Sequence, residues 1–139
     1  MEKVKNSGRP DRRQRRADLE QVLTLSAHLA PEERVLIDQI YREGLSIANV
    51  ARLRGRPAST VRTQVQGLIR RIHSPAFWYV VSHGDLLPKP TRTVGQMVIC
   101  QGMSQRAAAI RMRMSLHAVR KHVQTIQALV SLHAAAMSE

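Results

Sequence analysis

Two sets of polar side chains in this chain of 139 residues have the chemistry needed to read the edges of DNA bases. In each set an arginine is followed four residues later by a glutamine. Arginine pairs with guanine and glutamine with adenine, and a good two-bond pair is worth roughly 1–3 kcal/mol of discrimination. The predicted base-facing residues are Ser59, Thr60, Arg62, Thr63 and Gln66 in the first set and His117, Arg120, Lys121 and Gln124 in the second.

Both sets belong to one residue pattern that occurs twice with an offset of 58 positions. The first copy contains Gly44-Leu45-Ser46, Val50-Ala51, Gly55 and Thr60-Val61-Arg62, and the second contains Gly102-Met103-Ser104, Ala108-Ala109, Arg113 and Ala118-Val119-Arg120. A period of this size indicates a duplicated supersecondary unit. Small residues where two helices cross, a tight turn and an apolar anchor in the following helix are typical of a helix-turn-helix.

The charge of the chain favours a polyanionic partner. Lys and Arg number 22 against 10 Asp and Glu, a formal net charge of +12 at pH 7. Bases outnumber acids 7 to 4 in residues 1–28, 8 to 4 in 29–72 and 7 to 1 in 87–139, whereas 73–86 holds one acid and no base. Because each repeat is separately basic, we expect double-stranded DNA to contact both through its phosphates.

Further arginines are better placed for phosphates than for bases. Arg54, Arg56, Arg111 and Arg113 lie on the first helix of each pair or in the turn after it. Four more stand at the start of a predicted N-terminal helix, where positive charge opposes the helix dipole. They are either arm contacts to DNA or a solvated first turn: Arg12, Arg13, Arg15 and Arg16.

The helical periodicity, with no run of strict alternation, predicts an all-α fold. We expect two tandem trihelical helix-turn-helix units preceded by a basic N-terminal helix. The predicted segments are a basic arm and helix (1–28), the first unit (29–72), an aromatic linker (73–90) and the second unit with a long C-terminal helix (91–139). The aromatic residues Phe77, Trp78 and Tyr79 are expected to fill the interface between the repeats.

Local signals predict where the helices begin and which faces they bury. Pro31 suits a first helical turn, and Ser46, Thr91, Ser104 and Ser115 are predicted N-caps. We call the second helix of each helix-turn-helix, which is predicted to enter the major groove of DNA, the reading helix of its repeat. The predicted buried stripe of the first reading helix consists of Val61, Val65, Leu68 and Ile72. The last helix is expected to reach about Met137, with an apolar stripe from Val119 that packs on the first repeat or on a second copy of the chain.

Residues for other kinds of chemistry are few. His117 and His122 lie five apart, which is not the spacing of a helical metal pair, and Cys100 has no cysteine partner and is read as an inert core thiol. We therefore expect no catalysis, no cofactor and no metal site. Neither a signal peptide nor ~20 uninterrupted apolar residues is present, so a cytoplasmic location is expected.

The segment from Leu29-Ala30-Pro31-Glu32-Glu33-Arg34 through Glu43-Gly44-Leu45-Ser46 to Ser59-Thr60-Val61-Arg62 resembles bacterial sigma-factor region four. It is also similar to the effector domain of LuxR-type response regulators, which shares the same four-helix plan. The resemblance implies DNA recognition, and a bacterial or phage-encoded, nucleoid-associated protein. The second copy resembles these families more weakly, and Ala118-Val119-Arg120-Lys121-His122-Val123 is closer to the LuxR type.

The departures from the family pattern leave alternatives open. Pro57 replaces the expected cap of the first reading helix, and Arg113 replaces the turn glycine of the second unit. That unit therefore either contacts DNA or is purely structural. No segment resembles the sigma region that melts the −10 element.

The predicted function is sequence-specific binding of double-stranded DNA in transcriptional regulation. One alternative is an accessory factor that docks on RNA polymerase, and another is a phage-type small packaging (terminase) subunit. A homodimer through the C-terminal helix is a further candidate interaction.

Overall fold

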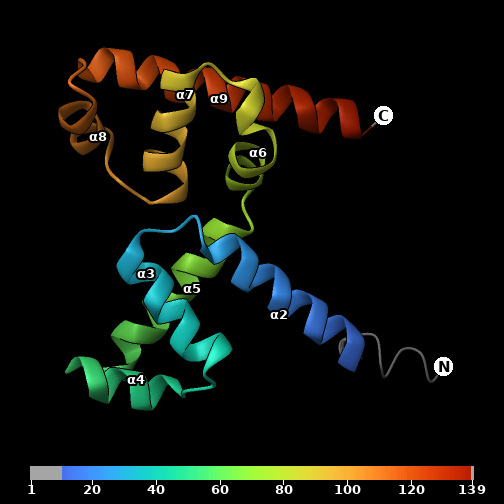
Figure 1. Cartoon of the computed structure of the whole chain (residues 1–139), viewed down its shortest axis with the longest axis vertical. Helices are drawn as coiled ribbons and strands as arrows, with labels where there is room; N and C mark the ends of the chain where they lie inside the picture. The colour runs from blue at the N-terminus through green and yellow to red at the C-terminus, as the bar shows by residue number, and fades with distance from the viewer. Residues whose placement is uncertain (1–10, 139) are drawn as a thin grey trace.

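A computed structural model describes residues 11–138, and these residues form helices and turns without a strand (Figure 1). The all-α prediction is therefore confirmed. The helices are α2 (Arg12–Ser26), α3 (Pro31–Ile37), α4 (Ile47–Arg54), α5 (Ala58–Ile72), α6 (Pro75–His83), α7 (Lys89–Gly95), α8 (Gln105–Met112) and α9 (Leu116–Met137). Wider helical turns, η1 (Asp38–Arg42) and η3 (Gln96–Cys100), extend α3 and α7, and a short 3₁₀ turn, η2 (Gly84–Leu86), follows α6.

The offset of 58 seen in the sequence recurs in the helix boundaries. The starts and ends of α3, η1 and α4 fall 58 residues before those of α7, η3 and α8, and α5 begins 58 residues before α9. Gly44 and Gly102, at φ 76° and 71°, adopt the left-handed conformation after η1 and η3. The predicted order of helix, helix, turn and reading helix is thus present twice in the described part of the chain.

The segment predicted as an aromatic linker contains the helix α6, which is the counterpart of α2. Val22 and Val80 are 58 residues apart and buried, and so are Ser26 and Gly84. α2 packs on α3, η1 and α5, whereas α6 packs on η3 and α9, the equivalents of η1 and α5. Each repeat therefore has four helices rather than the three predicted. The helical period was not apparent because α6 has only nine residues, of which three are aromatic.

Serine caps fix three helix starts as predicted. The hydroxyl oxygens of Ser46, Ser104 and Ser115 accept hydrogen bonds from the backbone N–H three residues later, at 3.0–3.1 Å. The prediction for Thr91 is wrong, because α7 begins at Lys89 after the extended backbone of Pro88. Thr91 is buried inside the first turn, where its Oγ1 forms a 2.9 Å hydrogen bond with His122 Nδ1 of α9.

One apolar core runs through both repeats. The predicted stripe of Val61, Val65, Leu68 and Ile72 is buried, which confirms that prediction. The same cluster contains Phe77, Tyr79 and Val80 of α6, together with Cys100 and Ile126 of the second repeat. The aromatic residues therefore lie between the repeats as expected, although Trp78 is 40% exposed. A smaller cluster inside the second repeat consists of Val94, Ala108, Ala109, Val119 and Val123.

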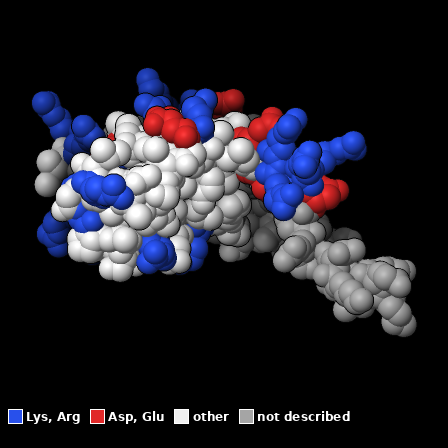
Figure 2. Space-filling model, turned by 90° about the horizontal axis from the view of Figure 1, so that it is seen from below, with Lys and Arg blue, Asp and Glu red and all other residues white. Residues whose placement is uncertain are grey.

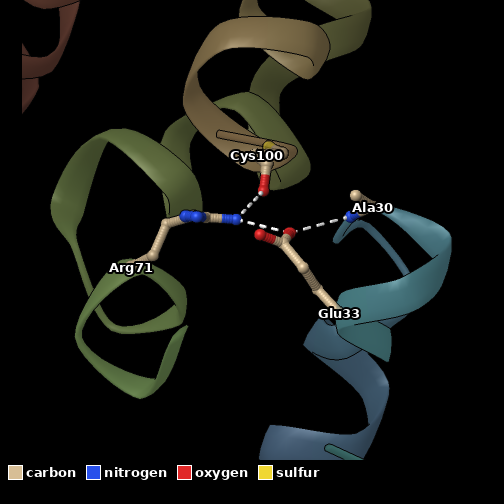
Figure 3. A network of polar contacts seen from close by, with 4 residues as sticks. All are labelled: Ala30, Glu33, Arg71 and Cys100. Atoms are coloured by element: carbon tan, nitrogen blue, oxygen red, sulfur yellow. Dashed lines mark hydrogen bonds and ion pairs between the residues drawn. The ribbon is translucent and has the colours of Figure 1, made fainter. Parts of the chain in front are cut away.

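Arg71 at the end of α5 forms a polar link between the repeats (Figure 3). Its Nη1 donates to Glu33 Oε1 at 2.7 Å and to the backbone oxygen of Cys100 at 3.3 Å. Glu33 Oε1 also accepts from the Ala30 N–H at 3.1 Å, at the start of α3. A Cβ on Gly102 would overlap the Arg71 guanidinium, so a side chain there would displace Arg71 from its contacts, and the positive φ also favours glycine.

The C-terminal helix reaches Met137 as predicted, but its apolar stripe is buried only in its first half. Val119, Val123 and Ile126 are buried, whereas Leu132 and Met137 are 67% and 73% exposed. Beyond Ile126, His133 packs against Trp78 of α6, with ring centroids 5.2 Å apart. The extension therefore packs on the helix between the two reading helices and then projects past it (Figure 1).

Replacing Gly95 with alanine should destabilise the fold, because helices cross most tightly there. The new Cβ would lie 2.8 Å from Ile126 Cδ1 and 3.2 Å from Val80 Cγ2. Overpacking of this kind typically costs about 1–3 kcal/mol of the free energy of unfolding, which urea denaturation measures. Gly67→Ala in α5 is the control, since its nearest neighbour would be the end of Arg70 at 3.9 Å. That variant should gain about 0.5–1 kcal/mol of helix propensity, and equal losses in both would contradict the tight crossing.

Arg71→Met should cost about 1.5–3 kcal/mol of unfolding free energy, because it removes charge-assisted hydrogen bonds and leaves Glu33 without its cation. Both side chains are largely shielded, at 26% and 17% exposure, so solvent screens the pair little. Arg70→Met provides a control with the same loss of charge at an exposed neighbouring position. Similar urea midpoints for the two variants would show that the link contributes nothing specific.

Candidate nucleic-acid interface

The polar set of the first reading helix faces solvent because the opposite side of α5 is anchored in the core. Gly55, at φ 63°, closes α4 and turns the chain into α5. Burial of Val61 and Val65 then directs the intervening side chains outward. The predicted base-facing residues are all exposed: Ser59, Thr60, Arg62, Thr63 and Gln66.

The second reading helix repeats this arrangement. Val119 and Val123 of α9 are buried against α7 and α8, and Ala108 and Ala109 fill the helix crossing as Val50 and Ala51 do in the first repeat. The outward residues of the first turns of α9 are again exposed: His117, Arg120, Lys121 and Gln124. The structure thus places both polar sets at equivalent positions of equivalent helices.

The arginines predicted to contact phosphates differ in exposure and in hydrogen bonding. Arg56, Arg111 and Arg113 are exposed. Arg54 is partly buried, and its Nη2 donates to Gln39 Oε1 at 3.1 Å, which holds it against η1. A phosphate contact from Arg54 would therefore need to use the remaining guanidinium donors or break this bond.

The turn of the second unit keeps its geometry without a glycine. Arg113 adopts φ 56°, the only positive φ of a non-glycine residue among the described residues. The Met114 N–H donates to the Ala109 oxygen at 3.0 Å, just as the Arg56 N–H donates to the Ala51 oxygen at 3.0 Å. A side chain in this left-handed conformation costs about 1–2 kcal/mol relative to glycine. Strain of this kind is often retained where the side chain has a function.

A shallow depression beside the start of α5 adds one residue that the sequence pattern did not single out. It is lined by Arg56, Ser59, Thr60, Thr63 and Gln64. Gln64 is partly buried and stands four residues after Thr60, so one turn of the helix brings the two side chains to the same edge. The helical period of the exposed positions is the signal that could have identified it.

The arginines of α2 form a separate basic cluster. Arg12, Arg13, Arg15 and Arg16 are exposed on the first turns of α2, which begins with a 2.7 Å bond from the Gln14 N–H to Asp11 Oδ1. Figure 2 shows this cluster as a blue patch at the α2 end of the molecule, with acidic groups beside it, while other Lys and Arg groups are spread around the rest of the face. The predicted arm before it lies outside the described residues.

Other features limit the chemistry of the described residues. No three His, Cys, Asp or Glu side chains of residues 11–138 are grouped as a metal site would require. Burial raises the pKa of the Cys100 thiol to about 12, against an opposing effect of the Arg71 charge, so the thiol is protonated at neutral pH as an inert core cysteine would be. None of the described helices is long and apolar enough to cross a membrane.

Residues 27–66 match the family model described as a helix-turn-helix domain. The chain therefore contains a helix-turn-helix domain in its first repeat. The matched segment spans α3, η1, α4 and the start of α5, and therefore includes the whole first polar set. A helix-turn-helix of this family supports DNA binding. No curated protein and no solved structure matches the chain. The match does not distinguish sigma region four from the LuxR type, and both resemblances stay predictions.

Arg113→Gly should stabilise the fold and weaken DNA binding. Relief of the left-handed strain should raise the free energy of unfolding by about 1 kcal/mol. Loss of a phosphate contact should weaken DNA binding on all sequences and reduce the slope of log affinity against log salt by about 1. Fluorescence anisotropy at several salt concentrations measures the second effect.

Gly55→Arg is the matched reverse variant, because a Cβ there meets no atom within 4 Å and only the φ of 63° is unfavourable. It should lose stability by a similar amount. Unchanged DNA affinity in Arg113→Gly would remove Arg113 from the interface, and unchanged stability would show that the turn is not strained.

Proposed function

We propose that this helix-turn-helix protein is a sequence-specific regulator of transcription that binds double-stranded DNA with both repeats. The observation that carries the proposal is the presence of two exposed polar sets at equivalent positions of α5 and α9. Arg62 and Arg120 occupy corresponding positions, as do Gln66 and Gln124. Within each repeat, the arginine suits guanine and the glutamine suits adenine in the major groove.

The arrangement of the repeats supports simultaneous binding. In Figure 1, α4 and α8 lie on the same side of the molecule, one below the other, so both turns and the starts of both reading helices face that side. The shared core and the Arg71 link hold the repeats together. A single chain would then bind two half-sites in successive major grooves, about 34 Å apart, without needing a second copy.

A polymerase-docking accessory factor is the second candidate, and uncovered apolar surface favours it. A shallow groove on α4 is lined by Leu45, Asn49, Arg52 and Leu53, and a second groove is lined by the residues 58 positions later, Met103, Ala107, Ile110 and Arg111. Leu53 and Ile110 are 70% and 76% exposed. Such surface suits a protein partner better than DNA phosphates.

The exposed apolar residues at the end of α9 support two further alternatives, a homodimer and a packaging subunit. Leu132 and Met137 would be covered in a homodimer through the C-terminal helix or in the ring of a packaging subunit. Light scattering of the purified chain distinguishes these forms from a monomer. Copurification with RNA polymerase, in the absence of specific DNA binding, would favour the accessory factor.

Selection of bound sequences from a random duplex pool at two salt concentrations tests the proposed function. We expect a motif with two spaced halves. Arg62→Ala should lose roughly 1–3 kcal/mol of affinity on the selected site and relax one base preference in one half, and Arg120→Ala should do so in the other.

Arg70→Ala is the control for these variants, since it removes an exposed positive charge from α5 outside the polar set. It should weaken binding little and leave the motif unchanged. A motif with one half only would make the second repeat structural. Enrichment of no sequence, with binding that disappears as salt rises, would show phosphate attraction alone and contradict a specific regulator.

A further inference from the structure

One edge of the second reading helix differs chemically from the equivalent edge of the first. In α5 this edge lines the shallow depression beside the start of the helix, and its side chains are neutral: Ser59, Thr60, Thr63 and Gln64. The residues 58 positions later in α9 include two histidines and a lysine: His117, Ala118, Lys121 and His122. The two repeats therefore present the same helical edge with different charge, and in α9 that charge depends on pH.

His122 is held on this edge by a hydrogen bond to α7. Its Nδ1 lies 2.9 Å from Oγ1 of the buried Thr91. A hydroxyl can donate to the neutral ring or accept from the protonated one, so this bond fits both charge states. The buried side-chain nitrogens that lack a partner among the described residues belong to Arg54, His83 and Arg92. His122 Nε2 forms no bond with a described residue and is not one of these buried atoms, so it reaches solvent.

The charged groups around the two histidines are positive. Arg120 and Lys121 lie between them on α9, and residues 86–138 contain no Asp or Glu. The helices that pack against α9, and the turn before it, carry these charged or titratable residues: Tyr79, His83, Lys89, Arg92, Arg106, Arg111 and Arg113. Of these, Tyr79 and His83 pack against His133, farther along α9. A positive charge on His117 or His122 therefore has no acidic partner in this repeat, and a DNA phosphate would supply one.

A protonated imidazole forms a charge-assisted hydrogen bond to phosphate, about twice as strong as one between neutral groups. We propose that His122, together with the exposed His117, contacts DNA in the protonated form, with His122 Nε2 on a phosphate oxygen. Protons and DNA then favour each other's binding, since such coupling is reciprocal. The second half-site is bound more tightly as the pH falls, whereas the first is not. This inference rests on the proposed function, because it requires the second repeat to bind DNA.

Fluorescence anisotropy with the selected duplexes, from about pH 8 to about pH 5.5 at constant ionic strength, tests the inference. Arg62→Ala and Arg120→Ala identify which half-site each repeat reads. Affinity for the second half-site should rise roughly tenfold over this range, and affinity for the first should change less than about twofold. The first half-site is an internal control, because protonation elsewhere on the chain would raise the affinity for both.

His122→Gln gives α9 the residue that α5 has at this position, and a glutamine amide can still bond with Thr91. It should reduce the tenfold change at the second half-site to about threefold or less. Adding His117→Ser, which again copies the first repeat, should abolish the change. His73→Gln is the control, since His73 is exposed at the end of α5 and outside both edges. That variant should keep the full pH dependence.

Calorimetry of the unaltered chain needs no variant to fold. Binding enthalpies measured at about pH 6.5, in two buffers of different ionisation enthalpy, give the number of protons taken up. Binding to the second half-site should take up protons, and binding to the first should take up none.

The inference is overturned if pH changes the affinity for both half-sites alike or for neither, or if the dependence survives in the double variant. In those cases a motif with two halves would still support the proposed function. A motif read by the first repeat alone would overturn the inference by removing the second contact. Failure to select any motif would instead contradict specific DNA binding itself.

Discussion

The contact of Arg71 with Glu33 and the Cys100 carbonyl is the constraint on which the arrangement of the repeats depends. Glu33 Oε1 accepts hydrogen bonds from the Ala30 N–H and from Arg71, so one carboxylate begins α3 and binds the end of α5. The same guanidinium reaches the last residue of η3. Because the cation and the carboxylate are largely shielded, removal of either would leave the other poorly solvated. Gly102 preserves this contact, since a side chain there would occupy the place of the guanidinium.

This use of Arg71 contrasts with the rest of the positive charge. Among residues 11–138, only Arg71 and Arg42 form ion pairs with described carboxylates, and the Arg42 pair is an exposed i, i+4 contact worth little. Most other cations stand on the surface of α2, the helix-turn-helix elements and the reading helices. The positive charges on this surface repel one another, and the repulsion falls when phosphates approach. Arg71 therefore links the two repeats, while most of the other described cations are exposed and available to a polyanion.

Local rules in the sequence predicted much of the fold and the exposure of the candidate interface. The three serine caps and the stripe from Val61 to Ile72 each depend on a few neighbouring residues, so a sequence pattern records them. The offset of 58 was visible because the same local signals occur twice. The features that were missed depend on tertiary contacts. α6 is too short to show a helical period, Thr91 is drawn into the core by His122, and the partners of Arg71 lie 38 and 29 residues away. The exposure of the two polar sets could be predicted, because burial of one face of a helix leaves the opposite face in solvent. Contacts with particular bases could not be predicted, because they depend on the sequence and position of the bound DNA.

The two repeats stabilise the same turn by different means. In the first, Gly55 adopts its positive φ without strain, and α5 starts at Pro57 without a side-chain cap. In the second, Arg113 is strained, but Ser115 caps α9 and the helix continues beyond the repeat to pack on α6. A left-handed arginine persists only where its surroundings fix the backbone, and the buried Ala109 and Val119 on either side of the turn do so. The extra anchoring of α9 therefore offsets the cost of placing a cation where the first repeat has none.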